Sequence, residues 1–93
     1  MNLITSSSFQ RALRATIKKQ PLLQQRIEQK LYLLAADPFN PLLRTHKLKG
    51  ELAGAWSCTV DYDCRLVFKF VENQETGEEE ILLIDIGTHD EVY

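Results

Sequence analysis

The sequence predicts an α+β fold in which an N-terminal helical hairpin packs on one face of a small antiparallel β-sheet. Two stretches with apolar residues at helical spacing come first, and stretches rich in β-branched and aromatic residues follow from residue 55 onward. Because the helices precede the strands and do not alternate with them, they should gather on one side of the sheet. The chain of 93 residues shows no repeat and no internal boundary, so we expect a single domain over residues 1–93.

The two predicted helices are separated by Gln20-Pro21. Residues 6–8 (SSS) offer hydroxyl oxygens that can accept the free amide hydrogens of a first helical turn. Gln20 should end this helix because a residue before proline avoids the α region, and Pro21 can begin the next helix, where its missing N–H does no harm. The segment ADPFNP should end the second helix. The apolar positions expected to face the sheet are Phe9, Leu13 and Ile17 in the first helix and Leu23, Ile27, Leu31 and Leu34 in the second.

Three strands are predicted after the hairpin, at residues 55–60, 64–70 and 81–86. The segment DYD (61–63) suits a tight turn between the first two strands, because Asp side chains bond their own backbone there. A polar loop over residues 72–80 leads to the last strand. The opening segment MNLIT is also β-prone.

Alternation along the strands predicts two unlike faces of the sheet. One face should be fully apolar and receive the helices. Arg65 and Lys69 point to the other face, where a cation is free to meet a ligand. The apolar face is expected to hold Leu66, Phe68 and Phe70 of the central strand and Leu82, Ile84 and Ile86 of the last strand.

Charge is unevenly distributed along the chain, although the net charge is only −2. Residues 1–50 hold nine Lys or Arg and two Asp or Glu, a net charge of +7, whereas residues 51–93 hold two and eleven, a net charge of −9. Either the N-terminal half faces an anionic partner, or basic helices pair with acidic strands within the fold.

Several classes of protein are disfavoured by the sequence. No apolar run is long enough to span a membrane, and the N-terminus lacks a signal-peptide pattern, so we expect a cytoplasmic protein without a membrane partner. Cys58 and Cys64 form neither a CxxC pair nor a dense framework, and we interpret them as reduced packing residues. Together with His46 and His89 they offer the atoms of a zinc site, but no ligand-pair spacing supports one, so we expect no metal and no cofactor.

The two histidines, His46 and His89, are candidate proton-transfer residues. Neither lies in an apolar helix stripe, and imidazole titrates near neutral pH, so the pair can serve as base and acid. Cleavage of RNA without a metal ion needs a base for the 2′-hydroxyl, an acid for the leaving 5′ oxygen, and a cation for the charge that builds on the phosphate. Arg65 can supply the cation because its planar guanidinium donates two hydrogen bonds to phosphate. We expect Gly87 to release the tail from strand pairing, so that His89 and Arg65 converge on one phosphate-sized hollow.

Basic residues near this set could bind the substrate. The segment RTHKLKG (44–50) brings Arg44, Lys47 and Lys49 close to His46, and Lys69 shares a sheet face with Arg65.

An aromatic ring could stack on a base, and the candidates are Trp56, Tyr62 and Tyr93. Each of these residues also has a purely structural interpretation. Trp56 could belong to the core, and Arg65 could form a salt bridge with Asp63 or Asp85.

Four segments of the chain, SSSFQRALRATIKK, HKLKG, YDCRLVFKF and IDIGTHDEVY, occur in a characteristic order. They resemble the first helix, the approach to the sheet, the YRLVY strand, and the closing strand with its tail in the RelE/ParE superfamily of bacterial toxins. The resemblance is closest to the YafQ-like branch of RelE messenger-RNA interferases and covers nearly the whole chain. It implies the family fold, a small antiparallel sheet that carries a helical hairpin.

The resemblance also implies a function, which is cleavage of messenger RNA on the ribosome, without a metal ion, by attack of the 2′-hydroxyl. His89 matches the histidine after GT in the tail and would be general acid or base. His46 matches the histidine before LxG, and Asp63 matches the acidic residue before the central strand; both would assist proton transfer or hold the substrate. Arg65 matches the RelE arginine and would stabilise the transition state. Tyr93 matches the closing aromatic residue and would stack or orient the nucleotide.

Two other functions stay open within the superfamily. ParE-type toxins inhibit DNA gyrase and lack the catalytic set, and a degenerate member could only bind its antitoxin. The YafQ-like pattern has a further histidine in the strand before the turn, where this chain has CTVDYD. In every case the resemblance implies an antitoxin partner in a hetero-oligomer, and a nuclease would also contact the ribosome and messenger RNA.

Overall fold

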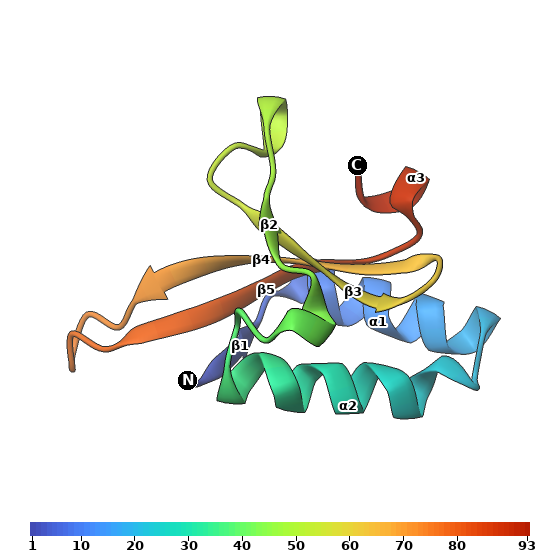
Figure 1. The fold of residues 1–93 in the computed structure, drawn as a ribbon, viewed down its shortest axis with the longest axis horizontal. Coiled ribbons are helices and arrows are strands. Elements are labelled where there is room, and N and C mark those ends of the chain that lie inside the picture. The colour runs from blue at the N-terminus through green and yellow to red at the C-terminus, as the bar shows by residue number, and fades with distance from the viewer.

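The computed structural model describes all residues, 1–93, as a five-stranded sheet with two long helices on one face (Figure 1). The strands are β1 (Leu3–Thr5), β2 (His46–Lys47), β3 (Trp56–Asp61), β4 (Cys64–Glu72) and β5 (Glu79–Gly87); the helices are α1 (Ser7–Lys19), α2 (Leu23–Ala36) and α3 (His89–Val92), with short 3₁₀ turns η1 (Pro41–Leu43) and η2 (Gly50–Leu52). The predicted α+β class and the helical hairpin are confirmed. None of the helices combines the length and the apolar character that crossing a membrane requires.

The sheet is mixed, whereas the sequence predicts an antiparallel one. Its strand order is β1-β5-β4-β3-β2, and the pairs from β2 to β5 are antiparallel as expected. The exception is β1, which pairs parallel to β5 with Leu3 opposite Ile81 and Thr5 opposite Leu83. Such a parallel pair requires a long connection, and here almost the whole chain lies between the two strands.

The ends of the helices follow from local sequence. The Ser6 hydroxyl oxygen accepts a hydrogen bond from the Phe9 amide at 3.0 Å, as the serine run predicts. Lys18 and Lys19 lie in the last turn of α1, where cations favour the negative end of the helix dipole. The helix α2 begins at Leu23, so Pro21 lies in the turn before it and not at its first position.

The main core lies between the two long helices and the sheet. The helix α1 packs against β5, and α2 packs against β3. The predicted helix stripes are confirmed, because their members are either buried in this core or packed against it. The buried residues of the core are Phe9, Leu23, Ile27, Leu34, Leu43, Cys58, Val60, Cys64, Leu66, Phe68, Ile81, Leu83 and Ile86.

A bulge in β5 exchanges the faces predicted for part of this strand. Val67 lies opposite Asp85, but the next residue, Phe68, lies opposite Leu83, which leaves Ile84 as the extra residue. An extra residue of this kind shifts the alternation of side chains by one position. The residues of β5 that reach the core are therefore Ile81, Leu83 and Ile86, and the prediction was wrong for Leu82 and Ile84.

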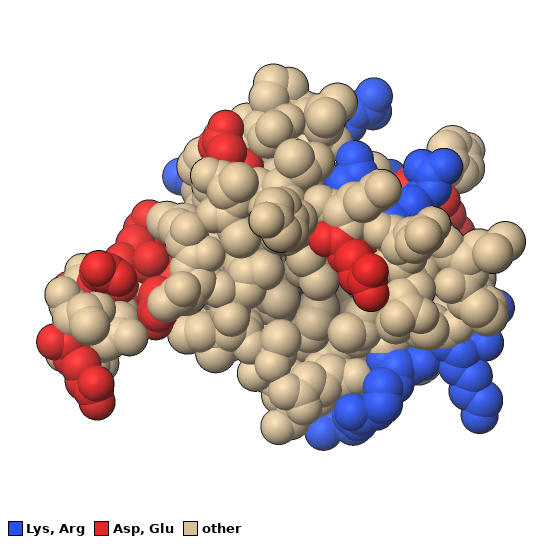
Figure 2. Space-filling model, turned by 90° about the horizontal axis from the view of Figure 1, so that it is seen from below, with Lys and Arg blue, Asp and Glu red and all other residues tan.

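Acidic and basic residues are segregated in space as well as in sequence. On the face shown in Figure 2, a cluster of Asp and Glu lies at the end where the β4–β5 hairpin projects, a few more lie elsewhere, and most of the visible Lys and Arg lie toward the other end. Two ion pairs join the halves of the chain, Lys19–Glu91 at 3.2 Å and Arg26–Asp61 at 3.6 Å. Internal pairing therefore accounts for few of the charges.

Candidate functional site

The sheet face that α1 and α2 leave uncovered, called the open face below, gathers several of the predicted site residues. His46 of β2 lies opposite Ser57 of β3, and Ser57 lies opposite Val67 of β4. Because directly opposite residues share a face, these three lie side by side across the sheet. Arg65 and Lys69 flank Val67 at two-residue spacing on the same strand and therefore point to the same face.

The C-terminal tail folds back as the one-turn helix α3 and covers part of the open face (Figure 1). Its start is fixed by a capping box, in which the Thr88 hydroxyl accepts from the Glu91 amide and the Glu91 carboxylate accepts from the Thr88 amide. Val92 is buried against Ala55 and Val67. The tail is thus anchored on the sheet by packing and by its own cap.

Gly87 allows this close return of the chain. A side-chain carbon at this position would lie 3.0 Å from Glu91 Oε1 and 3.2 Å from Glu91 Cβ. These distances are shorter than most contacts of a Cβ atom, so Glu91 would have to move by a few tenths of an ångström. Gly87 still pairs with Arg65 in the β4–β5 ladder. Gly87 is the last residue of β5, so the pairing ends directly after it, one residue later than predicted, and the glycine also makes room for α3.

Tyr93 and His89 form the part of α3 that reaches over the open face. The Tyr93 hydroxyl donates a hydrogen bond to Ser57 Oγ. The rings of His89 and Tyr93 make an edge-to-face contact with centroids 4.6 Å apart. Since Ser57 lies opposite His46 in the sheet, His46, Ser57, Tyr93 and His89 follow one another in a row across the open face.

Ser57 belongs to this row although the sequence did not single it out. Its side chain is fully buried, and its hydroxyl is the partner of Tyr93. The available signal was a small polar residue between Trp56 and Cys58, because a buried polar side chain usually has a hydrogen-bond partner.

His46 is exposed and is oriented by the backbone before it. Its Nδ1 lies 3.0 Å from the carbonyl oxygen of Arg44. A carbonyl oxygen can only accept a hydrogen bond, so this contact is a hydrogen bond in the ring form with hydrogen on Nδ1, in which Nε2 holds the lone pair when the ring is neutral.

Arg65 is held by the turn between β3 and β4. Its Nη1 donates to the carbonyl oxygens of Asp61 at 2.9 Å, Tyr62 at 3.1 Å and Cys64 at 3.4 Å. The predicted alternative of a salt bridge is not found, because the ion pairs of the chain involve other residues. Its Nη2 and Nε make no hydrogen bond within the protein, so a fixed guanidinium keeps donors for a ligand.

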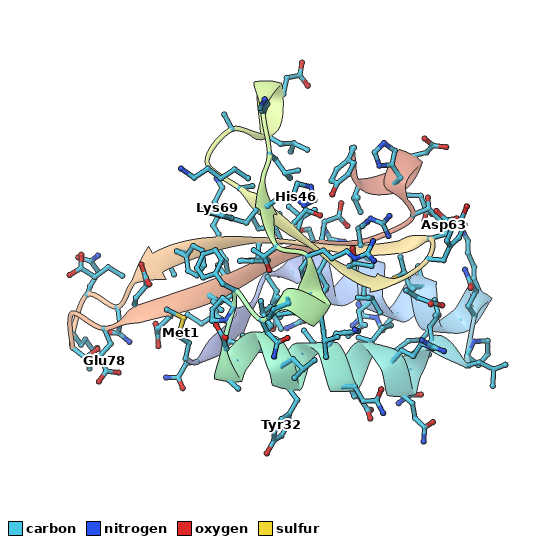
Figure 3. All side chains as sticks on the ribbon, viewed as in Figure 1. Met1, Tyr32, His46, Asp63, Lys69 and Glu78 are labelled. Carbon is cyan, nitrogen blue, oxygen red and sulfur yellow. The ribbon has the colours of Figure 1, made fainter.

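The remaining predicted polar residues lie around this row. Figure 3 shows His46 and Lys69 on the side of the sheet away from α1 and α2, and Asp63 at the β3–β4 turn. Arg44 and Lys49 are exposed in the segments that flank β2. His89 and Arg65 lie at the same end of the sheet, because Arg65 pairs with Gly87, two residues before His89.

Trp56 and Lys47 are not brought to the open face. They lie opposite each other at the edge of the sheet, with Lys47 Nζ 5.4 Å from the centre of the Trp56 ring. Trp56 is half-buried against the main core, in edge-to-face contact with Phe39 and Phe70. Tyr62, in contrast, is 93% exposed at the β3–β4 turn.

Asp85 is a second open-face residue that the sequence did not place in the site. It is half-buried beside Val67 in the ladder, and burial raises the pKa of its carboxyl group. A hydrogen bond from the Ile86 amide to Oδ1 opposes this shift in pKa.

The cysteines are separated from the histidines by the sheet. Cys58 and Cys64 belong to the main core, whereas His46 lies on the open face. Burial raises the pKa of the Cys58 thiol to about 12 and that of Cys64 to about 11, so both thiols are protonated at neutral pH. No group of three or more His, Cys, Asp or Glu is arranged to hold a metal ion.

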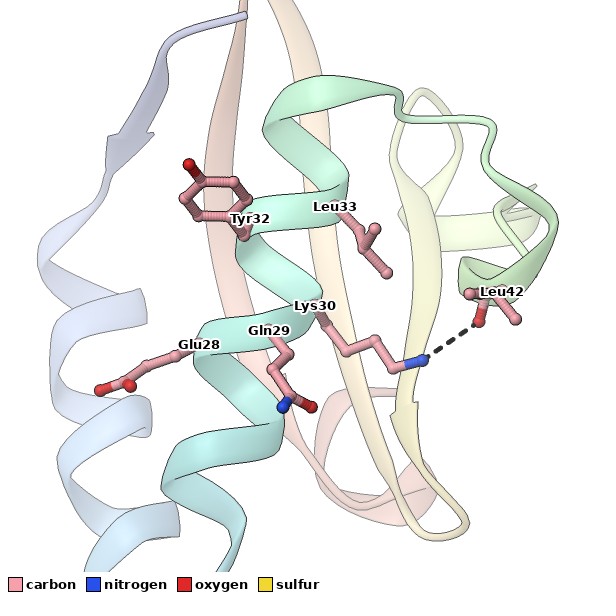
Figure 4. Close-up of a pocket in the computed structure, with 6 residues that line it drawn as sticks. All are labelled: Glu28, Gln29, Lys30, Tyr32, Leu33 and Leu42. Atoms are coloured by element: carbon pink, nitrogen blue, oxygen red, sulfur yellow. Dashed lines mark hydrogen bonds between the residues drawn. The ribbon is translucent and has the colours of Figure 1, made fainter.

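The cavities of the molecule lie away from the open face. The largest, of about 560 Å³, is a groove on α2 beside η1, where Lys30 Nζ donates to the Leu42 carbonyl (Figure 4). Two smaller cavities lie near the joint between α1 and α2. None of the three is lined by His89 or Arg65, so the expected hollow between them is not formed and the candidate site is an open surface.

Comparison with family models matches the whole chain to one family. The family model described as a bacterial toxin of type II toxin–antitoxin systems, YafQ, matches residues 1–93. Toxin YoeB of Streptomyces coelicolor is 38% identical over 50 residues, which cover 54% of this chain and 60% of that toxin. This second match therefore spans less than two thirds of its relative's length.

Solved structures share the fold at low sequence identity. The crystal structure of YafQ from E. coli strain BL21(DE3) has a TM-score of 0.79 and 16% identity, covering 99% of this chain and 97% of that one. A chain of the E. coli DinJ–YafQ toxin–antitoxin complex has a TM-score of 0.76 and 17% identity, covering 99% and 96%. These likenesses establish the architecture of the sheet and helices.

Proposed function

The chain belongs to the YafQ family of bacterial toxins of type II toxin–antitoxin systems, and from this membership we propose that it is an endoribonuclease. It cleaves messenger RNA on the ribosome, without a metal ion, by attack of a 2′-hydroxyl on the adjacent phosphate. The observation that carries this proposal is the row His46–Ser57–Tyr93–His89 on the open face, with the anchored Arg65 at the same end of the sheet as His89.

Two histidines can provide both proton transfers of the reaction. The neutral His46 ring holds its lone pair on Nε2, which suits a base that removes the proton of the 2′-hydroxyl. His89 is exposed on α3 and, in its protonated form, suits the acid that protonates the leaving 5′ oxygen. The two roles require opposite protonation states, with His46 neutral and His89 protonated at the start of the reaction.

Arg65 fits the role of stabilising the transition state. The attack adds negative charge to the oxygens of the phosphate, and a fixed donor aimed at them lowers the barrier more than a mobile one. Three backbone carbonyls hold Nη1, so the guanidinium loses little freedom when Nη2 and Nε bind phosphate oxygens.

The other predicted residues serve to bind and orient the RNA. Tyr93 is held by Ser57 and can orient the nucleotide at the row, and Asp63 can act from the neighbouring turn. Lys69 adds positive charge on the open face, and Arg44 and Lys49 add it around β2, where phosphate contacts raise affinity. Lys47 and Trp56 would act from the edge of the sheet, with Trp56 the less accessible of the two.

An antitoxin is the proposed protein partner. The E. coli YafQ structure with 17% identity to this chain was solved in a complex with DinJ, a toxin–antitoxin complex. We expect this chain to form a comparable hetero-oligomer. Co-expression with the adjacent reading frame should rescue growth and yield; equal yields without that frame would count against a neutralising partner.

The nuclease function is tested by inducing the wild type, His89→Ala and Asp90→Ala in bacterial cells and mapping the ends of messenger RNA. Asp90 is the matched control, because it is an exposed neighbour on the same helix without a proposed role. Cuts in phase with codons are expected for the wild type and Asp90→Ala, and their loss is expected for His89→Ala. Purified protein should cut a message in translating ribosomes and leave naked RNA intact.

The same experiment separates the alternatives. Growth arrest with intact messages would replace the nuclease by a gyrase-inhibiting toxin, and a gyrase supercoiling assay would then detect inhibition. If neither the wild type nor the variants arrest growth, the remaining interpretation is a module that only binds its antitoxin.

A further inference from the structure

We propose that Arg44 is a positioning residue for His46 and acts through its backbone. Its left-handed conformation turns the Arg44 carbonyl toward the imidazole and fixes the ring in the form with hydrogen on Nδ1. The consequence for catalysis rests on the nuclease function proposed above, whereas the state of the ring can be measured without any RNA.

The backbone of Arg44 is unusual for its residue type. Arg44 is the only residue other than glycine with a positive φ, at φ 52° and ψ 44°. Residues with a Cβ rarely adopt this region, because the Cβ approaches the following carbonyl, and β-branched residues do so least of all. Such a conformation persists where the surroundings enforce it.

The turn before Arg44 supplies that enforcement. The Asn40 side chain accepts a hydrogen bond from the Leu42 amide at 2.9 Å and caps the start of η1. Leu43 is fully buried in the main core, and the Arg44 amide donates to the Pro41 carbonyl at 3.3 Å. The direction of the Arg44 carbonyl is thus set by the backbone of a closed and anchored turn, and the Arg44 guanidinium makes no hydrogen bond that contributes to it.

The hydrogen bond to His46 has a chemical consequence. Because the carbonyl oxygen only accepts, Nδ1 keeps its hydrogen in both the neutral and the protonated ring. Nε2 is then the atom that gains and loses the proton, and it makes no hydrogen bond within the protein. An exposed imidazole without this contact exchanges between both neutral forms and offers the Nε2 lone pair for only part of the time.

Arg44 can therefore contribute to RNA cleavage in two separable ways. The exposed guanidinium can contact RNA, whereas the carbonyl orients the base. Substitutions that remove the side chain but differ in backbone preference separate them. Arg44→Gly removes the guanidinium and accepts a positive φ readily, while Arg44→Val removes it and disfavours a positive φ.

The experiment measures the ring nitrogens of His46 by long-range ¹H–¹⁵N NMR on the ¹⁵N-labelled full chain, at a pH where the ring is neutral. In the wild type and Arg44→Gly, Nδ1 should resonate as a protonated nitrogen and Nε2 as an unprotonated one. In Arg44→Val the two shifts should move toward each other, as expected for exchange between both forms. The ring signals of His89, which lies on α3, are the internal control and should be the same in all three proteins.

A wild-type His46 with hydrogen mainly on Nε2 would overturn the proposal, whether or not the variants fold. Identical His46 shifts in folded Arg44→Gly and Arg44→Val would also overturn it. Cleavage of ribosome-bound message is then compared between the two variants, and Arg44→Gly should be several-fold faster than Arg44→Val. If the ring form changes as expected but no protein cleaves RNA, the proposed nuclease function fails and the positioning role of Arg44 stands.

Discussion

The two faces of the sheet differ in what their side chains do. The helix-covered face is a continuous apolar core in which Phe68, Leu66 and Cys58 are fully buried. The open face holds only a small apolar cluster, Ala55, Val67 and Val92, surrounded by polar groups that are oriented by hydrogen bonds. Stability is therefore expected to depend mainly on the first face and RNA cleavage on the second.

Neighbouring residues of β4 offer the largest contrast, because Phe68 points to the helices and Val67 to the open face. We expect Phe68→Ala to lower the free energy of unfolding by about 3–5 kcal/mol, since it leaves a cavity in the core. Val67→Ala removes two methyl groups at about 0.8 kcal/mol each, so about 1.6 kcal/mol is expected. Urea unfolding of both purified variants measures the difference, and equal losses would contradict the division between the faces.

The histidines should show the opposite behaviour. Replacing His46 or His89 by Ala should slow cleavage of ribosome-bound message by about 100-fold or more, the usual contribution of a general acid or base. Both side chains are exposed, so the free energy of unfolding should change by no more than about 0.5 kcal/mol. Single-turnover cleavage and urea unfolding are measured on the same preparations. If a variant loses activity only to the extent that it unfolds, the histidine has a structural role and not a catalytic one.

The buried thiols should make the helix-covered face sensitive to alkali. Burial raises the pKa of Cys58 to about 12 and of Cys64 to about 11, whereas an unfolded thiol has a pKa near 9.0. Stability is thus fully present below pH 9 and falls as pH rises, because the unfolded chain releases these protons first. The slope approaches about 1.4 kcal/mol per pH unit for each thiol. The double variant Cys58→Ala, Cys64→Ala should flatten this decline in unfolding measured between pH 8 and pH 10; an unchanged slope would assign the decline to other groups.

Periodicity predicted most of the fold because the helices and the central strand repeat their apolar residues without interruption. The helix stripes and the face of Leu66 and Phe68 follow from that repetition. The bulge at Ile84 could not be predicted, since a bulge depends on the partner strand and leaves no local mark in a run of apolar residues. The parallel pairing of β1 likewise depends on a contact between the two ends of the chain.

The candidate site was predicted in its residue types more than in its geometry. The strand parity of Arg65 and Lys69 placed them correctly on the open face, because β4 keeps its alternation and the extra residue of the bulge lies in β5. The expected hollow was not found, because α3 folds onto the sheet through Val92 and the Gly87 contact. Ser57 was missed because its partner Tyr93 is distant in sequence and only the tertiary fold joins them.

The contact of Tyr93 with Ser57 tests how firmly α3 is held on the open face. We expect Tyr93→Phe and Ser57→Ala each to destabilise the protein by about 1 kcal/mol, the usual contribution of one hydrogen bond. Because the two hydroxyls are partners, the double variant should cost less than the sum, with a coupling of about 0.5–1 kcal/mol. Additive losses in urea unfolding would show that Tyr93 does not depend on Ser57 for its position.

The smallest effect is expected for the ion pair that joins α3 to α1. Lys19 and Glu91 are both well exposed, so Lys19→Ala should cost at most about 1 kcal/mol, and less at high salt. Lys18→Ala is the matched control, because Lys18 is exposed in the same helical turn and forms no ion pair. The Thr88 amide and Lys19 lower the pKa of Glu91 below its usual 4.5, so the contribution is present above that pH and fades as the carboxylate is protonated. The free energies of unfolding of the two variants should therefore become equal at high salt and at pH 3. A difference that persists there would mean that Lys19 supports α3 by packing. The hydrogen bonds and the small apolar cluster would then not be the only contacts that hold α3 on the open face.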